Sequence, residues 1–298
     1  MGVVDFHVHL PYQLMYPDYF LNSFLDKFET NQTHKSMQLR MIRTRLNDYD
    51  GEMLINNMDA AGIDRAVLLV PDLFFYTGCD EYGAELRRIH EHHLSIKEKH
   101  GDRFVLFAGV DPRRGNDGIR ILESFFNKGF CGLKLYPPTG FDIGDDSVLP
   151  YYALCERLRL PILLHIGPSL AGMRTTFDFP AALDRVATAY SNVTFVLGHA
   201  GILFLDQSMQ LAIQHSNVYL DISGFQKLYG QRDVLCKKFM KLLSNVGHKA
   251  LFGTDWPIYS HLNDIQRDVD QVKEICSDLN IATDLLFHQN ANSILPLY

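Results

Sequence analysis

The sequence has few cysteines, no excess of positive charge and no long apolar run. Its five cysteines are odd in number and widely spaced, without a C-x-x-C pair, which excludes a disulfide framework and a thiolate zinc site. The 28 Lys and Arg against 35 Asp and Glu give a net charge of −7, which argues against sequence-independent binding of nucleic acid. No run approaches the ~20 apolar residues of a membrane span, and residues 1–7 have neither a basic start nor a hydrophobic signal core. These features predict a cytoplasmic protein that binds neither nucleic acid nor membranes.

What the sequence does contain is a recurring pattern of short apolar runs. They are almost continuously apolar and do not alternate with polar residues, which is typical of strands covered on both faces in a parallel sheet. The eight predicted strands lie in residues 3–9, 66–70, 104–110, 131–136, 161–165, 193–199, 218–222 and 250–255.

Segments with helical spacing separate most of these runs, in residues 82–100, 118–128, 150–158, 179–190, 206–215 and 233–246. Strand followed by helix, repeated eight times with right-handed crossovers, closes into an α/β fold, the (β/α)₈ or TIM barrel. A doubly wound open sheet is the alternative, but no glycine-rich phosphate-binding turn follows any predicted strand.

An unusually long interval separates the first two strands. Residues 11–51 are rich in aromatics, Met, Asn and charges, and they predict a partly helical insertion at about residues 11–60, where a barrel's active site opens. Two roles fit this predicted insertion equally well: a lid over the site, or a subunit contact in a homodimer. No interdomain linker is visible, so we expect one domain over residues 1–298.

Polar residues stand where several strands end. His7 and His9 close the first strand and face the same side, because side chains two residues apart in a strand share a face. A lone histidine here is more often a satisfied polar group, and a lone aspartate more often caps a turn. Chance does not readily supply His165, His199 and Asp255 at three further strand ends, and imidazoles with a carboxylate suit Zn²⁺.

With these residues in place, the chain resembles the amidohydrolase superfamily, in particular its amidohydrolase-2 branch of metal-dependent hydrolases and decarboxylases. The resemblance runs through nearly the whole chain in the family's order. The matching segments are Asp5-Phe6-His7-Val8-His9, Gly132-Leu133-Lys134-Leu135-Tyr136-Pro137, Leu164-His165, Leu197-Gly198-His199-Ala200-Gly201, Phe252-Gly253-Thr254-Asp255-Trp256-Pro257 and Asn290-Ala291-Asn292-Ser293-Ile294.

The resemblance implies one divalent metal ion per chain, usually zinc, held by His7, His9, His165 and Asp255 with a water completing the shell. His199 would lie beside that water and polarise it or assist proton transfer. Elementary chemistry agrees, because a metal ion lowers the pKa of bound water towards ~7. Asp255 can bind the ion with one oxygen and accept a proton with the other, so His199 and Asp255 are the expected catalytic residues.

Lys134 leaves two interpretations open. In two-metal relatives a lysine on strand four is carboxylated and bridges both ions, which would make His199 a ligand of the second ion. In the one-metal branch the lysine more plausibly orients an anionic substrate. Tyr136, Arg174 and Trp256 follow strands four, five and eight, so we expect them to contact the substrate, with Arg174 pairing with a carboxylate or standing as an exposed loop charge.

The predicted function is therefore metal-dependent hydrolysis of a small amide, lactone or ester by metal-activated water. The alternative is a lyase, a non-oxidative decarboxylase of a small aromatic or unsaturated acid on the same metal. Both predict a small, carboxylated substrate. A third hypothesis, an inactive barrel that serves as a scaffold, predicts missing ligands, and none is missing from the sequence.

Overall fold

A computed structural model of the chain describes residues 2–26, 32–78, 80, 82–168, 173, 179–258 and 265–295. Eight parallel strands form one sheet in the order in which they occur in the sequence, β1 to β8. The predicted (β/α)₈ barrel is confirmed. The strands are β1 (Val3–Val8), β2 (Ile63–Leu69), β3 (Phe104–Gly109), β4 (Leu133–Leu135), β5 (Ile162–His165), β6 (Phe195–Gly198), β7 (Val218–Asp221) and β8 (Ala250–Leu251).

Backbone hydrogen bonds between β1 and the segment after β8 close the barrel. The Phe6 amide donates to the Phe252 carbonyl at 2.8 Å, and the Asp255 amide donates to the His7 carbonyl at 2.8 Å. Further along, the His9 amide donates to the Trp256 carbonyl at 2.7 Å. This seam brings the first and last predicted site segments together, although almost the whole chain separates them in sequence.

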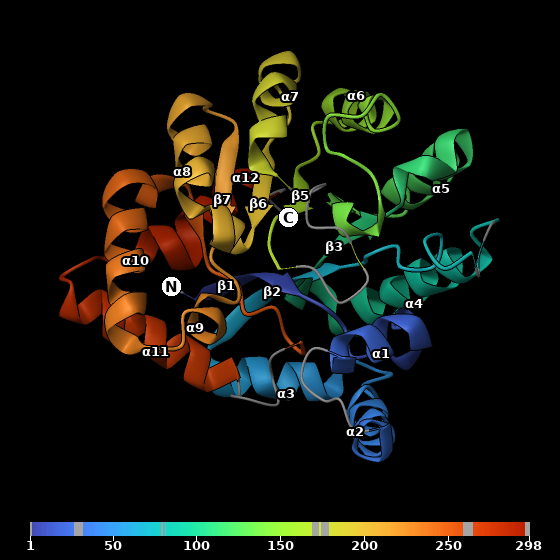
Figure 1. Cartoon of the computed structure of the whole chain (residues 1–298), viewed down its shortest axis with the longest axis horizontal. Coiled ribbons are helices and arrows are strands. Elements are labelled where there is room, and N and C mark those ends of the chain that lie inside the picture. The colour runs from blue at the N-terminus through green and yellow to red at the C-terminus, as the bar shows by residue number, and fades with distance from the viewer. Residues whose placement is uncertain are drawn as a thin grey trace.

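The helices lie around the strands, and the inserted α1 and α2 lie at one edge of the molecule (Figure 1). In the first crossover, α3 packs on β2 and on α11. The helices are α1 (Asp18–Asp26), α2 (Gln32–Arg45), α3 (Glu52–Ala61), α4 (Ala84–His100), α5 (Gly115–Phe126), α6 (Leu149–Leu158), α7 (Leu183–Ala189), α8 (Leu205–Gln214), α9 (Phe225–Leu228), α10 (Arg232–Val246), α11 (Ile265–Asp278) and α12 (Asn290–Ile294), with a π-helical turn at Leu285–Gln289 before the last.

Two apolar clusters hold this architecture together. The larger one fills the space between the strands and the helices. The smaller one includes Phe6, Phe107, Leu163 and Leu251, which fill the barrel interior. Burial of apolar surface on both faces explains why the strands are almost continuously apolar in sequence.

The predicted insertion, about residues 11–60, contains α1, α2 and α3. Its first residues pack into the main core, where the ring of Tyr12 stacks on His92 of α4 with the centroids 3.9 Å apart. By contrast, α2 carries Met37 and Met41 one turn apart on an exposed face, 59% and 51% accessible. The roles of lid and subunit contact stay predictions.

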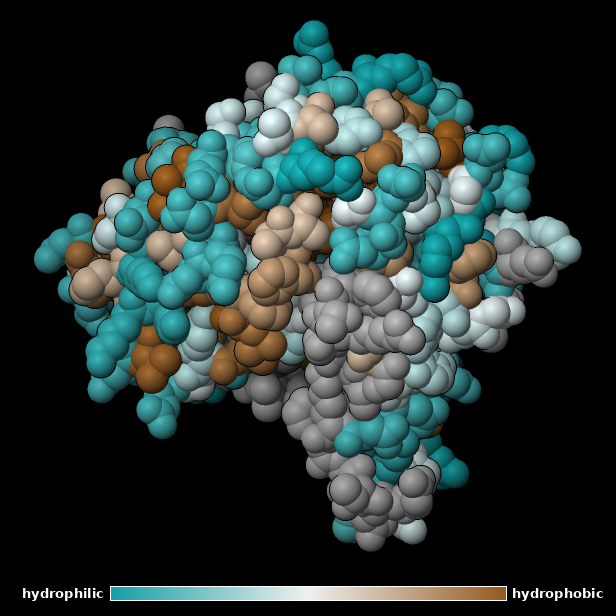
Figure 2. Space-filling model, turned by 45° about the horizontal axis from the view of Figure 1, so that its top comes forward, coloured by the Kyte–Doolittle hydropathy of each residue, from teal (hydrophilic) through white to brown (hydrophobic). Residues whose placement is uncertain are grey.

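Hydrophilic side chains cover most of the face shown in Figure 2, and hydrophobic ones form scattered groups. Among the described residues, no helix has both the length and the apolar character that crossing a bilayer requires. The sequence prediction of small buried thiols is met at Cys131 and Cys155, which are 8% and 0% exposed.

His90 of α4 links its helix to β3 and makes folding pH-dependent. Its Nδ1 donates to the Leu86 carbonyl at 2.7 Å, and its Nε2 accepts from the Gly109 amide at 3.0 Å. Burial lowers the pKa of His90 to about 4, so the folded state favours the neutral ring. The contribution of His90 to the free energy of unfolding is therefore fully present above ~6.5, the pKa of histidine in the unfolded chain. It is lost as the pH falls from ~6.5 towards 4.

We expect His90 to account for about 2 kcal/mol of the unfolding free energy lost by the metal-free protein between pH 7.5 and pH 5. Urea denaturation at the two pH values measures this loss. His90→Gln, which cannot be protonated, should show a smaller pH dependence by that amount, and an equal dependence in both proteins would contradict the assignment.

Candidate metal centre

Six of the residues predicted from strand ends lie at the carboxyl end of the barrel and are buried. They come from different strands or from the residues that directly follow them, so closing the barrel brings them together. They are His7 in β1, His9 after it, Lys134 in β4, His165 at the end of β5, His199 after β6 and Asp255 after β8.

A change of register in β1 directs His7 into the barrel. Phe6 belongs to the interior cluster, yet the neighbouring His7 also faces inward, since it contacts Lys134 of β4 and Asp221 of β7. Two successive residues face one side only where a strand is irregular. The pairing of β1 with β2 shifts register between Asp5 and Val8, which accounts for the arrangement.

Two imidazoles of the β1 segment face one carboxylate oxygen. Nε2 of His7 lies 3.5 Å from Oδ1 of Asp255, and Nε2 of His9 lies 3.4 Å from the same atom. Ligands held at ~2.1 Å in a tetrahedron around one ion are about 3.4 Å apart. Each imidazole is therefore as far from the Asp255 oxygen as two ligands of one divalent ion are from each other.

In both rings Nδ1, the nitrogen that faces away from Asp255, already makes a hydrogen bond, and this bond fixes the tautomer. Nδ1 of His7 donates to Oδ2 of Asp221 at 2.5 Å, and Nδ1 of His9 donates to the Leu69 carbonyl at 3.1 Å. Both Nε2 atoms are then unprotonated and can bind a metal ion. A carboxylate or a carbonyl behind a ligating imidazole is the usual arrangement in metal sites.

A second chain of hydrogen bonds fixes the other two histidines. A carbonyl can only accept, so Nδ1 of His199, 3.1 Å from the Ser223 carbonyl, carries the proton. With its proton on Nδ1, His199 accepts at Nε2 from Nδ1 of His165 at 3.1 Å. This leaves Nε2 of His165 unprotonated, and that buried atom has no hydrogen-bond partner. An orphaned buried nitrogen lone pair fits the role of metal ligand.

Burial and charge set the protonation states of the cluster. Burial lowers the pKa of His7 and His165 well below the usual value, and neighbouring positive groups lower it further. Burial alone would raise the pKa of Asp255, but the electrostatic influence of the neighbouring His7 and His9 side chains outweighs it and leaves this pKa below its usual value. Burial lowers the pKa of Lys134 to about 8. Near neutral pH the site thus holds neutral His7 and His165 rings, an Asp255 carboxylate and a mostly charged Lys134.

His7, His199 and Asp255 each offer a ligand atom within 4.8 Å of the other two. His199 is therefore placed either to bind an ion or to act on a group bound beside it. Lys134 lies next to this set, with its Nζ 3.4 Å from Nε2 of His7. The one-metal and two-metal interpretations both stay open.

The backbone at two of these residues is strained. His199 and Asp255 both have φ near +58°, a left-handed conformation that costs non-glycine residues of order 1–3 kcal/mol and is common at functional sites. At Gly253 a Cβ would lie 2.6 Å from Oδ1 of Asp221 and 2.9 Å from Cβ of His7, so only glycine allows the segment after β8 to approach these side chains.

The predicted substrate-contacting residues lie in different surroundings. The half-buried Tyr136 packs its ring against His165, with the centroids 4.6 Å apart. Trp256 is buried beside Asp255, and its carbonyl takes part in the barrel seam. Arg174 lies outside the described residues.

The site contains polar residues that the sequence did not single out. Asp221 supports His7, and Oγ of Ser223 lies 3.0 Å from Nδ1 of His7 and 2.9 Å from Nδ1 of His199. Asp5 accepts from the Thr254 hydroxyl at 2.7 Å and so ties β1 to the segment that carries Asp255. The available signal for Asp221 was its position as an acid at the end of a strand.

We expect Asp221→Asn to weaken metal affinity by about 10–100-fold, the usual effect of losing the group that orients a ligating histidine. The amide cannot supply the negative charge that favours the His7 Nδ1 proton. Competition with a chromogenic chelator measures the affinity. Asp206→Asn, which changes an exposed aspartate paired with Lys241, is the matched control, and equal affinities in wild type and Asp221→Asn would contradict this role.

A family model described as "Amidohydrolase" matches residues 4–297. Among curated proteins, none matches the chain in sequence.

Solved structures share its fold. 2,6-Dihydroxybenzoate decarboxylase from Rhizobium is 18% identical, with a TM-score of 0.66 over 99% of this chain and 98% of that one. 5-Carboxyvanillate decarboxylase from Novosphingobium aromaticivorans, solved with manganese, is 17% identical, with a TM-score of 0.63 over 98% and 96%. An amidohydrolase from Burkholderia multivorans, solved with bound zinc, is 13% identical, with a TM-score of 0.70 over 99% and 100%.

Proposed function

Because the chain belongs to the amidohydrolase family, we propose that it is a metal-dependent decarboxylase of a small hydroxylated aromatic acid. The observation that carries this proposal is that a buried lysine and a buried carboxylate lie on the same imidazole: Nε2 of His7 is 3.4 Å from Nζ of Lys134 and 3.5 Å from Oδ1 of Asp255. Similar solved structures include decarboxylases of dihydroxybenzoate and carboxyvanillate, which favours this reaction over the hydrolysis predicted from the sequence.

We propose that His7, His9, His165 and Asp255 hold one divalent ion. Zinc and manganese are both candidates, since similar proteins contain one or the other. A bound divalent ion supplies positive charge that attracts a carboxylate and lowers the pKa of a neighbouring hydroxyl.

The residues around this position can carry the protons that the reaction moves. As a carboxylate, Asp255 takes the proton of the substrate's ring hydroxyl and then returns it to the ring carbon that bears the carboxyl group. The carbon–carbon bond to that group breaks, its electron pair restores the aromatic ring, and carbon dioxide leaves. Charged Lys134 holds the substrate's negative charge, His199 lies within reach to assist proton transfer, and the Tyr136 ring and Trp256 provide flat apolar walls.

Hydrolysis of a small amide, lactone or ester is the second candidate. The same buried carboxylate can take a proton from water and pass it to a leaving group. The similar fold of a zinc-containing amidohydrolase favours it.

One experiment separates these reactions. Purified protein loaded with zinc or manganese is incubated with a panel of hydroxybenzoates and, separately, with small lactones, esters and amides. The proposal expects carbon dioxide release and, in deuterium oxide, a deuteron on the vacated ring carbon. Hydrolysis of the second panel without decarboxylation of the first would replace the proposal with the hydrolase.

The remaining sequence predictions also stay proposals. They are a cytoplasmic location, a homodimer and a single domain over residues 1–298. We propose in addition that Arg174 contacts the substrate carboxylate.

A further inference from the structure

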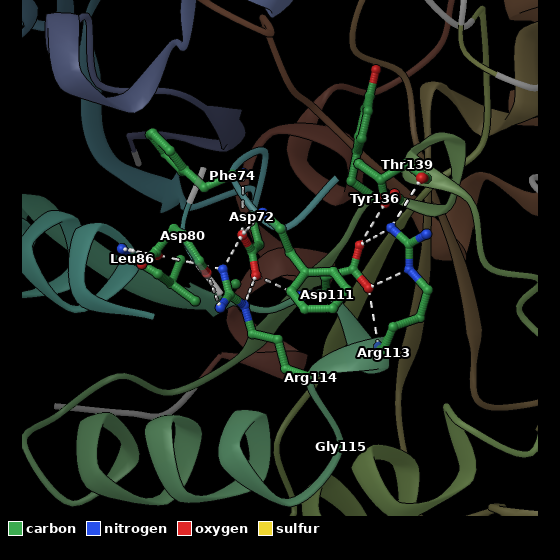
Figure 3. Close-up of polar contacts among 12 residues, drawn as sticks. Asp72, Phe74, Asp80, Leu86, Asp111, Arg113, Arg114, Gly115, Tyr136 and Thr139 are labelled. Carbon is green, nitrogen blue, oxygen red and sulfur yellow. Dashed lines mark hydrogen bonds and ion pairs between the residues drawn. The ribbon is translucent and has the colours of Figure 1, made fainter. Parts of the chain in front are cut away.

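Two adjacent arginines follow β3 and point in different directions (Figure 3). Arg114 points towards Asp72 and Asp80, which lie in the loop after β2, whereas Arg113 points towards Asp111 and Thr139. Phe75 lies under both guanidinium groups, with its centroid 5.4 Å from Cζ of Arg113 and 5.0 Å from Cζ of Arg114. The pair therefore joins the loops after β2, β3 and β4 at the active-site end of the barrel.

The Arg114 side of this arrangement is buried and rigid. Its Nε donates to Oδ2 of Asp72 at 2.6 Å, and its Nη1 donates to the Asp80 carbonyl at 2.6 Å. The same Oδ2 of Asp72 accepts from the Asp111 amide at 2.8 Å. Arg114 and both acids are less than a tenth exposed, and removing one member would leave an unpaired buried charge. This side fixes the backbone at Asp111.

The Arg113 side extends this fixed point to the loop after β4. Nε and Nη2 of Arg113 donate to the two carboxylate oxygens of Asp111 at 2.8 and 2.6 Å, the fork geometry of a strong ion pair. Nη2 also donates to the Thr139 carbonyl at 3.0 Å. A side chain at position 140 would meet this guanidinium, since a Cβ on Gly140 would lie 2.9 Å from Nη1.

Thr139 connects Asp111 to the backbone of Tyr136. Its hydroxyl lies 3.0 Å from Oδ2 of Asp111 and 2.9 Å from the Tyr136 carbonyl, and its amide donates to that carbonyl at 3.2 Å. The short 3₁₀ turn Pro137–Thr139 is thus held at both ends. The residue at its start is the aromatic one that packs on His165.

We propose that Asp111, Arg113 and Thr139 form a clamp that positions Tyr136, and that this clamp determines how tightly the site binds a flat aromatic substrate. The inference rests on the proposed function for the nature of the substrate. The placement of the Tyr136 ring against His165 is independent of the proposed function. These three residues are positioning residues, because they act through Tyr136 and not on the reacting atoms.

Thr139→Val removes the hydroxyl and keeps the shape, whereas Thr139→Ser keeps the hydroxyl. We expect Val to raise the dissociation constant and KM of an aromatic acid by about tenfold, the effect of one hydrogen bond, with kcat and metal content nearly unchanged. Ser should restore wild-type binding. Because Trp256 is the chain's single tryptophan and lies at the site, quenching of its fluorescence by 2,6-dihydroxybenzoate measures binding without turnover.

A double-mutant cycle with Tyr136→Leu tests the route of the effect. If the clamp acts through Tyr136, Thr139→Val has no further effect on binding once the ring is gone. Arg113→Lys, which loses the fork at a partly exposed position, provides a second variant if Thr139→Val folds poorly. Arg120→Ala, which removes an exposed arginine of α5 paired with Asp117, is the control.

A substrate-free readout separates this inference from the proposed function. The His165 ring resonance in isotope-labelled protein senses the neighbouring Tyr136 ring, so Thr139→Val and Tyr136→Leu should both move it and Thr139→Ser should not. If no aromatic acid binds the wild type, the proposed function fails, but this resonance still tests the clamp. A Thr139→Val protein with lower thermal stability and an unmoved His165 resonance would overturn the clamp and leave a merely structural network.

Discussion

Replacing Asp255 with asparagine is expected to lower the rate of the proposed decarboxylation by about 10²–10⁴-fold, the range for loss of a positioned acid–base group. The amide has nearly the same size and can still offer an oxygen to a metal ion, but it cannot take or return a proton. In the wild type the neighbouring imidazoles hold the pKa of Asp255 below its usual value, so the resting group is ready to accept. Steady-state rates and metal content of the same sample measure the two effects.

Asp184→Asn is the matched control, because it makes the same chemical change at an exposed aspartate paired with His215. It should leave the rate within a factor of two or so of wild type. Retained metal with a full rate in Asp255→Asn would remove Asp255 from proton transfer. Loss of all metal would instead assign it mainly to ion binding, and in that case an excess of metal in the assay should restore part of the rate.

The barrel and most of the candidate site could be predicted because the signals are local. Near-continuous apolar runs mark strands covered on both faces, and a polar residue that ends such a run must point towards the barrel mouth or towards the helices. His7, His165 and Asp255 carry this signal. Strand eight shows its limit, because the predicted run 250–255 forms a strand only at Ala250–Leu251. Beyond that, the chain leaves regular geometry to bring Asp255 against β1.

The groups that support these residues depend on contacts distant in sequence. Asp221 contacts His7 only because the barrel closes, and the register shift in β1 that directs His7 inward has no motif. From the sequence alone, Arg113 and Arg114 are most simply interpreted as solvated charges, but the folded chain buries Arg114 between two aspartates. These ion pairs form only where the loops after β2 and β3 lie together in the folded chain.

The last prediction concerns His199 and Lys134, where the one-metal and two-metal models differ. With one ion, His199→Ala should keep one equivalent of metal and lose about 10²–10⁴-fold in rate as an acid–base group. Lys134→Ala should then raise the KM of the substrate and leave the metal content nearly unchanged. His215→Ala is the control for loss of a histidine. The His215 ring is mostly buried, pairs with Asp184 and does not belong to the candidate site.

The side chain of Lys134 could be carboxylated. A pKa of about 8 leaves a fraction of neutral amine near pH 7.5, and a neutral amine can be carboxylated. Carboxylation would replace a cation by an anion next to His7, so the second ion would depend on it, and either substitution should remove about one ion per chain. Bicarbonate should then assist metal reconstitution of the wild type. We expect Lys134→Ala to bind zinc strongly with no response to bicarbonate, because Lys134, with its Nζ 3.4 Å from Nε2 of His7, fits as the cation that would hold a substrate anion beside a single metal ion.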